Sequence, residues 1–164
     1  MKTENKKIQD MLNKLISDEW FAGQIYYLFP KAVKSEDRGK IAELMVDIAQ
    51  DELFDHMKNL ERCAMELGLD TPSTYKQMEK YADKDDVKLF ENCKKGQDAI
   101  FYLDKSIEAE KRAIDTYEKY VDDNELKEFQ DLYLVVKNNY YDEIEHLEKF
   151  TFAKNQLEAM EQFA

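Results

Sequence analysis

The sequence predicts an all-α protein, folded as an antiparallel four-helix bundle with one long crossover that contains a short helix. The 164 residues include only 4 Gly and 2 Pro, and 37% of them are charged, a composition typical of long solvated helices. Apolar residues recur at helical spacing in four long segments, and no segment shows the alternation of a strand. Two short turns and one longer connection separate these segments, as in bundles with a single crossover.

The first helix is predicted from apolar residues that recur at helical spacing between Ile8 and Phe29. Glu19 falls on the same stripe, so its carboxylate would face the interior of the bundle. Pro30 interrupts the pattern, because proline has no backbone N–H to donate and its ring collides with the preceding turn. We therefore expect this helix to weaken or kink at Pro30.

The second helix is expected to begin with the capping segment 35–37 and to end at Gly68, since glycine commonly terminates helices. Its apolar stripe includes Glu52 and Asp55. A crossover of roughly 18 residues follows, as expected for this type of bundle. Residues 73–81 of the crossover are predicted to form its short helix.

The third helix is predicted over residues 87–121, with Glu110 on its apolar stripe. Residues 122–124 break the pattern and cap the fourth helix, which is predicted over residues 126–160. Two helical hairpins therefore flank the crossover, and we expect residues 1–164 to form a single domain.

The main functional signal is a pair of glutamates that recurs at one spacing in both predicted hairpins. Glu19 and Glu52 lie 33 residues apart, and so do Glu110 and Glu143. Residues equidistant from a turn stand at the same height in an antiparallel pair, so all four carboxylates can share one level of the interior. This arrangement is typical of a dinuclear metal site in a four-helix bundle.

Each second glutamate is followed three residues later by another candidate ligand: Asp55 follows Glu52, and His146 follows Glu143. An i, i+3 pair projects from one face of a helix, so these side chains would point the same way as the glutamates. Five carboxylates in a dry core would be very costly without protons or cations. Two divalent cations would neutralise most of this charge, and an oxygen-rich site with some nitrogen suits iron or manganese.

A tyrosine follows the first glutamate of each hairpin by seven residues: Tyr26 follows Glu19, and Tyr117 follows Glu110. Two turns along a helix, both phenols would face the same interior. A phenol in that position can hydrogen-bond a metal-bound carboxylate or supply an electron. The alternative is a core aromatic residue whose hydroxyl group is simply satisfied.

Four segments together resemble the ferritin superfamily, nearest to bacterioferritin and the Dps-like mini-ferritins. They are LNKLISDEWFAGQIYY at 12–27, DELFDHMKNLERCAMELG at 51–68, SIEAEKRAIDTY at 106–117 and DEIEHLEKF at 142–150. The resemblance implies a ferritin-like bundle with two iron ions, Tyr26 as the catalytic tyrosine beside them, and Fe(II) oxidation by O2 or H2O2 for iron storage or detoxification. The implied metal ligands are Glu19, Glu52, Asp55, Glu110, Glu143 and His146, with Glu52 and Glu143 as bridges.

Some positions depart from the family pattern. The family's second-helix histidine falls on Asp55 in this register, but His56 follows directly and would replace Asp55 if the helix were locally wound differently. Leu53 stands where bacterioferritin has its haem methionine, so we expect no haem. The chain ends soon after the fourth helix, without the short fifth helix of 24-subunit shells. We therefore expect a homo-oligomer that is either a dimer or a Dps-like shell.

Other functions on the same site stay open, because a fold does not decide a reaction. The main alternatives are a rubrerythrin-like or manganese catalase-like enzyme that removes peroxide, and a di-iron oxygenase. A DNA-coating protein or a bundle without metal is a further alternative. Cys63 and Cys93 form no CxxC pair of the kind found in rubredoxin-like modules, and we expect them to be small buried apolar residues.

The net charge of −12 argues against a nucleic-acid partner and suits a protein that attracts cations. No apolar run approaches the roughly 20 residues needed to cross a bilayer, and the N-terminus lacks a signal-peptide pattern. We therefore expect a cytoplasmic protein whose partners are Fe(II) and O2 or H2O2, with no membrane partner.

Overall fold

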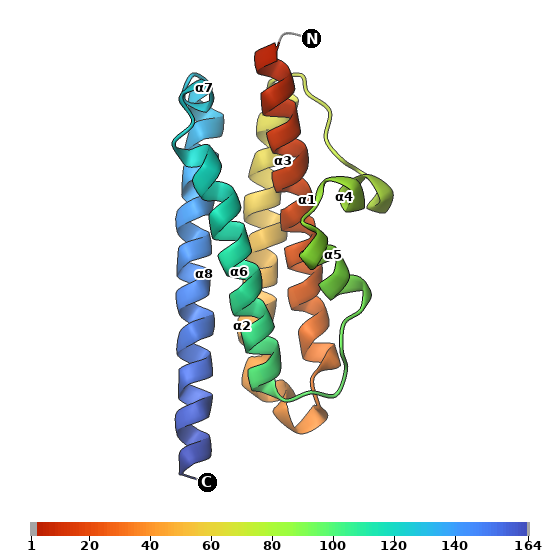
Figure 1. Cartoon of the computed structure of the whole chain (residues 1–164), viewed down its shortest axis with the longest axis vertical. Helices are drawn as coiled ribbons and strands as arrows, with labels where there is room; N and C mark the ends of the chain where they lie inside the picture. The colour runs from red at the N-terminus through yellow and green to blue at the C-terminus, as the bar shows by residue number, and fades with distance from the viewer. Residues whose placement is uncertain (1–2, 164) are drawn as a thin grey trace.

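The computed structural model describes residues 3–163, and within that range every regular element is a helix. Four long helical rods run along the long axis of the molecule (Figure 1). In chain order they are α1 (Thr3–Ala32); α2 (Arg38–Asp51), η2 (Glu52–Met57) and α3 (Lys58–Glu66), which form one rod; α6 (Ala99–Val121); and α8 (Gln130–Gln162). The predicted all-α bundle with one long crossover is confirmed.

The first turn is the 3-10 segment η1 (Ser35–Asp37), close to where the sequence predicts a break. Helix α1 continues through Pro30 to Ala32, slightly beyond the predicted weak point at Pro30. Asp37 does not cap α2 with its side chain. Its buried carboxylate instead accepts the backbone N–H of Ala99 at 2.9 Å, and so joins this turn to the start of α6.

The crossover contains two short helices rather than one: α4 (Tyr75–Tyr81), as predicted, and α5 (Lys84–Glu91). The predicted start of the third helix at residue 87 is therefore wrong, and α6 begins at Ala99. The chain leaves the helical conformation after Glu91, and Gly96 adopts a φ of 78°, which favours glycine. The carboxylate of Asp98 then caps α6 by accepting the N–H of Phe101 at 2.9 Å.

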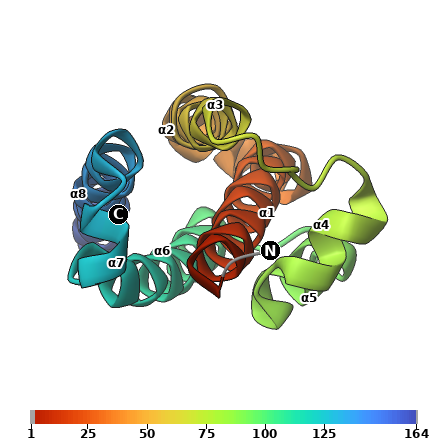
Figure 2. The same cartoon turned by 90° about the horizontal axis from the view of Figure 1, so that it is seen from above.

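Helices α4 and α5 both pack against α1, on the side away from α8 (Figure 2). The crossover thus covers one face of the bundle, where α5 also contacts α6 through the hydrogen bond between Arg112 and Asp86. Cys63 is buried on α3, as expected, whereas Cys93 is only half-buried in the crossover, and both thiols are free.

The second turn contains the short helix α7 (Asn124–Lys127), so the last long helix begins at Gln130 and not at the predicted residue 126. Asp123 caps α7, because its side chain accepts the N–H groups of Glu125 and Leu126. Among the described residues, none of the helices combines the length and apolarity that a bilayer span requires.

Gly23 on α1 packs directly against the side chain of Leu53 on η2. A Cβ atom at Gly23 would lie 2.3 Å from Cγ of Leu53 and less than 3 Å from both of its δ carbons. We expect Gly23→Ala to lower the free energy of unfolding by about 1–3 kcal/mol, because overpacking forces such atoms apart. Thermal or denaturant unfolding measures this change.

A double-mutant cycle with Leu53→Ala provides the control. The smaller side chain at position 53 removes the clash. The double variant should therefore lose less free energy of unfolding than the two single variants lose in sum, and the difference should exceed about 0.5 kcal/mol. Additive effects would contradict the close contact between Gly23 and Leu53.

Candidate metal centre

Four glutamates and two histidines from all four rods converge in the middle of the bundle. Each is at most 2% exposed to solvent. They are Glu19 of α1, Glu52 and His56 of η2, Glu110 of α6, and Glu143 and His146 of α8.

These residues form two groups that share two members. One oxygen or nitrogen from each of Glu19, Glu52, His56 and Glu143 lies within 4.8 Å of the others. The same holds for Glu110 and His146 taken together with the shared pair Glu52 and Glu143. Two ligand groups with two carboxylates in common have the composition of a two-metal site with bridging glutamates.

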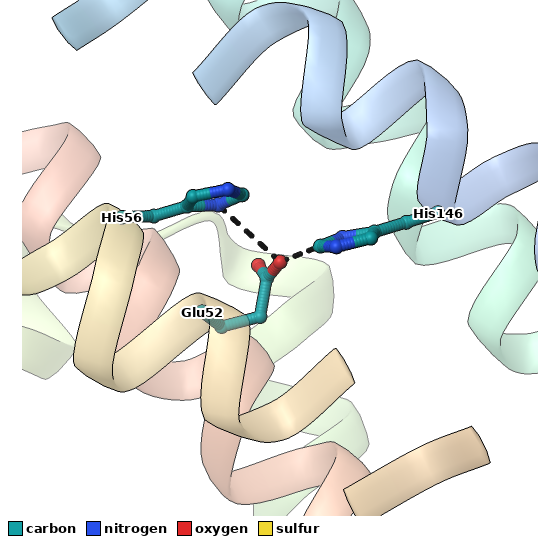
Figure 3. A group of neighbouring side chains, drawn as sticks. All are labelled: Glu52, His56 and His146. Atoms are coloured by element: carbon teal, nitrogen blue, oxygen red, sulfur yellow. Dashed lines mark ion pairs between the residues drawn. The ribbon is translucent and has the colours of Figure 1, made fainter. Parts of the chain in front are cut away.

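Each histidine points its Nδ1 atom inward. Nδ1 of His56 lies 2.9 Å from Oε1 of Glu143 and 3.4 Å from Oε1 of Glu52. Nδ1 of His146 lies 2.9 Å from the same Glu52 oxygen. Figure 3 shows Glu52 between the two rings, which are nearly parallel at 23° with centroids 5.5 Å apart.

The outer nitrogen of each ring contacts an aspartate on the opposite helix. Nε2 of His56 lies 3.0 Å from Asp142, and Nε2 of His146 lies 3.1 Å from Asp51. Each aspartate directly precedes one of the two shared glutamates in the sequence. A carboxylate on the outer nitrogen fixes the ring orientation and leaves the inner nitrogen free to bind a metal.

Asp142→Asn is expected to weaken divalent metal binding by about 10–100-fold, because an amide orients the His56 ring less firmly than a carboxylate does. Titration with Co²⁺, followed by its absorption spectrum, measures the affinity. Asp115→Asn is the matched control, since Asp115 is exposed on α6 and the substitution changes the net charge equally. Equal Co²⁺ affinities of the two variants would contradict a role of Asp142 in positioning His56.

The structure does not bring Asp55 into the cluster. Asp55 is exposed, accepts the side-chain N–H of Asn59 at 2.7 Å, and approaches only the outer side of His56, next to Asp142. The reason is the π-helical conformation of η2, in which one turn holds an additional residue. The residue that faces the same way as Glu52 is then the fourth one after it, His56, and not the third.

Seven buried atoms of the cluster have no hydrogen-bond partner among the described residues. Some of them lie within 3 Å of one another, but their directions do not meet hydrogen-bond geometry. Burying so many unsatisfied polar atoms is costly unless something binds them, and carboxylate and imidazole donors around two shared glutamates fit two divalent cations. The atoms are Oε2 of Glu19, Oε1 of Glu52, Nδ1 of His56, Oε2 of Glu110, Oε1 and Oε2 of Glu143, and Nδ1 of His146.

Without metal, protons compensate part of the charge on the glutamates. Burial, and then the nearby Glu143 carboxylate, raise the pKa of Glu19 above its ordinary value. The same two causes, in the same order, raise the pKa of Glu110 well above its ordinary value. The cluster therefore retains protons that a metal ion would have to displace.

The histidines respond to the same carboxylates. Burial alone would lower the pKa of His56, but the surrounding acids, first among them Glu19, raise it well above its usual value. Burial also opposes the charge on His146, yet the close contact of its Nδ1 atom with Glu52 and the neighbouring carboxylates raise its pKa to about 9. The surrounding carboxylates therefore favour the cationic form of both rings in the metal-free protein.

Tyr26 and Tyr117 face the interior, and each contacts a glutamate of the other helix. Tyr26 of α1 donates its hydroxyl to Oε1 of Glu110 at 2.7 Å, and Tyr117 of α6 donates to Oε1 of Glu19 at 2.5 Å. The side-chain amide of Asn139 donates to the Tyr117 hydroxyl at 3.2 Å. Burial, followed by these carboxylates, raises the pKa of both phenols well above its ordinary value, so both keep their protons.

Two solved structures share this fold. A dodecameric thioferritin, the bacterioferritin-related protein from Bacteroides fragilis, aligns with a TM-score of 0.78 and 20% sequence identity over 96% of this chain and 89% of its own. A ferritin from M. penetrans aligns with a TM-score of 0.70 and 14% identity over 93% of this chain and 85% of its own. No protein-family model and no curated protein matches the sequence. The chain therefore has a ferritin-like fold, and that prediction is confirmed.

Proposed function

We propose that this ferritin-like chain is a ferroxidase-type di-iron protein, which oxidises Fe(II) with O2 or H2O2 for iron storage or detoxification. The observation that carries the proposal is the set of seven unsatisfied donor atoms, which converge from four helices on one buried point. A solvated acidic surface would not need such convergence. A purely structural core would satisfy these atoms with hydrogen bonds.

The proposed ligands follow the two overlapping groups of the cluster. Glu52 and Glu143, the shared members, would hold both ions. Glu19 and His56 would complete the ligands of one ion, and Glu110 and His146 those of the other. His56 takes the place that the sequence assigns to Asp55. Manganese could occupy the same donor set, because its preference for oxygen and nitrogen is similar to that of iron.

Iron bound there would supply the electrons, one from each ion, and the protein supplies charge, position and a dry environment. Tyr26 keeps its proton and uses it to hold Oε1 of Glu110, which leaves Oε2 free to bind. Asp142 and Asp51 hold the two imidazoles from outside in the same way. The rods exclude bulk water, since every proposed ligand is buried.

Tyr26→Phe is expected to lower the rate of Fe(II) oxidation by about 10-fold and to leave the number of bound ions unchanged. The substitution removes the phenol hydroxyl that bonds Oε1 of Glu110, without removing a ligand. Oxidation is followed by absorbance, and binding by anaerobic titration. Phe152→Tyr, an exposed aromatic exchange on α8, is the control. An unchanged rate in Tyr26→Phe would limit Tyr26 to a packing role.

We further propose that residues 1–164 act as one domain in a cytoplasmic homo-oligomer. The thioferritin that this chain resembles is dodecameric, which supports an assembly of identical chains, either a dimer or a Dps-like shell. Size-exclusion chromatography with light scattering determines the number of chains.

Iron retained per chain after aerobic Fe(II) loading and desalting tests the function. Tens of ions per chain would support storage in a mineral. About two per chain, the capacity of a dinuclear site, would support a redox enzyme that does not store iron. No retained iron, together with no bound manganese, would overturn the metal centre itself.

A further inference from the structure

A cavity extends from the metal cluster, between α1 and α6, to the first turn of α5. A water-sized sphere can enter about 20 Å³ of it, roughly the room that one water molecule needs. Its inner end is lined by cluster glutamates, including Glu19 and Glu110, whose unsatisfied Oε2 atoms are buried there. The cavity thus connects the proposed ligands with side chains nearer the surface.

The middle of the cavity is lined by small side chains. Ala22 of α1 faces it from one side, and Ala109 and Ala113 of α6 face it from the other. Because an alanine side chain ends at Cβ, these residues leave space between the two helices. A larger residue at any of these positions would narrow the cavity without touching the charges at either end.

The outer end carries three aspartates and only two cationic groups. Asp86 is 7% exposed and accepts a hydrogen bond from Nη2 of Arg112 at 2.7 Å. Asp83 lies 3.8 Å from Nε of the same arginine. The Asp18 carboxylate accepts hydrogen bonds from Nζ of Lys14 at 3.0 Å and from the backbone N–H of Asp83 at 2.7 Å. Asp83 and Asp86 therefore share the single guanidinium group of Arg112, whereas Asp18, whose pKa burial raises to about 7, pairs with Lys14.

Arg112 closes this end through one short contact. Its Nη2 atom donates to Asp86. Its buried Nε atom has no hydrogen-bond partner among the described residues. A metal cation that binds Asp86 can replace the guanidinium group without leaving the buried carboxylate uncompensated. The arginine side chain is partly exposed and can move toward solvent.

We propose that this cavity is the passage by which divalent cations reach the metal centre, with Asp86 as the outer acceptor and Arg112 as a displaceable counter-ion. The proposal rests on the proposed function only in requiring that the centre binds divalent cations. Acidic groups at a narrow mouth raise the local cation concentration and the association rate. At the inner end the cation meets the free oxygens of Glu19 and Glu110.

A residue that lines a passage affects the kinetics of metal binding differently from a residue that coordinates the bound metal. Narrowing it slows association and dissociation by the same factor, so the equilibrium affinity stays constant. Stopped-flow mixing of the metal-free full-length chain with Co²⁺, together with displacement by a chelator, measures both rates. Equilibrium titration gives the dissociation constant and the number of ions.

Two variants test the two parts of the passage. Asp86→Asn removes the outer charge, and Ala113→Leu fills the middle. Each is expected to slow Co²⁺ association and dissociation by about 10-fold, with an unchanged dissociation constant. Asp85→Asn is the matched control, because Asp85 is exposed on the same helix and does not line the cavity. Thermal unfolding of each variant verifies its fold.

Unchanged rates in both variants, with normal Co²⁺ stoichiometry, would overturn the passage and leave the metal centre intact. A change in the dissociation constant would also overturn it, because the residue would then act on the bound state. A wild-type chain that binds no Co²⁺ would instead overturn the proposed function. A 10-fold slowing in both directions, absent from Asp85→Asn, would support the passage.

Discussion

Glu110→Gln is expected to weaken divalent metal binding at least about 100-fold and to abolish Fe(II) oxidation. A glutamine keeps the shape and can still accept the Tyr26 hydroxyl, but it lacks the anionic oxygen that remains unsatisfied in the cluster. Loss of a ligand should exceed the 10–100-fold loss that follows removal of an outer-shell partner. Co²⁺ titration and an oxygen-consumption assay with Fe(II) measure the two effects.

The same substitution should hardly change the stability of the metal-free protein. Burial, and then the Glu143 carboxylate, raise the pKa of Glu110 well above its ordinary value there, so the neutral acid is favoured and a neutral amide of the same shape is a mild replacement. We expect the free energy of unfolding without metal to change by less than about 1 kcal/mol. Glu118→Gln, exposed on the same helix, is the control. Retained metal binding in Glu110→Gln would remove Glu110 from the ligand set.

The stability of the metal-free protein is expected to fall as the pH rises from about 5 to about 9. The pKa values of Glu19, Glu110, His56 and His146 are all raised in the folded state. A group whose pKa is higher in the folded than in the unfolded state stabilises the folded protein. This contribution is complete at pH values below the unfolded-state pKa and is lost as the pH rises through the folded-state pKa. His146, raised from 6.5 to about 9, contributes on the order of 3 kcal/mol that disappears in this window.

Two further buried acids act in the same direction. Burial raises the pKa of Asp18 to about 7 and that of Asp86 to about 6. The lowered pKa values of Asp37 and Asp123, held down mainly by Lys40 and Lys7, affect stability only at more acidic pH. The net slope between pH 5 and 9 should therefore be negative without metal.

Bound metal should reverse this slope. Divalent cations displace the cluster protons, so metal binding, and the stability it adds, increase as the pH rises. Scanning calorimetry from pH 5 to 9, with chelator and with excess Mn²⁺, compares the two states. We expect the metal-free unfolding temperature to drop on the order of 10 °C across the range, whereas the loaded protein shows no drop. A metal-free protein that becomes more stable with rising pH would contradict the assigned charges.

The four glutamates illustrate what spacing can predict. Glu19 and Glu52 are equidistant from the first turn, and Glu110 and Glu143 from the second, so antiparallel packing places each pair at one height. This depends on helical rise and turn position alone, both of which the residue pattern indicates. The structure brings all four into one cluster, although it does not test metal ligation.

The choice between Asp55 and His56 shows where spacing fails. A regular α-helix places Asp55 beside Glu52, but η2 is π-helical and turns His56 inward. The inward position of His56 is stabilised by Asp142 and Glu143, which come from a helix about 90 residues away in sequence. Local propensity carries no information on such contacts.

The sequence by itself determined the helical class, the two hairpins, and the level at which the glutamates and His146 meet. These follow from periodicity and chain geometry, which act over neighbouring residues. Only the tertiary structure decided the local winding at His56, the separation of α5 from α6, and the cavity that leads to Asp86. Each of these depends on long-range packing, in which distant side chains offset the cost of an unusual backbone or of a buried charge.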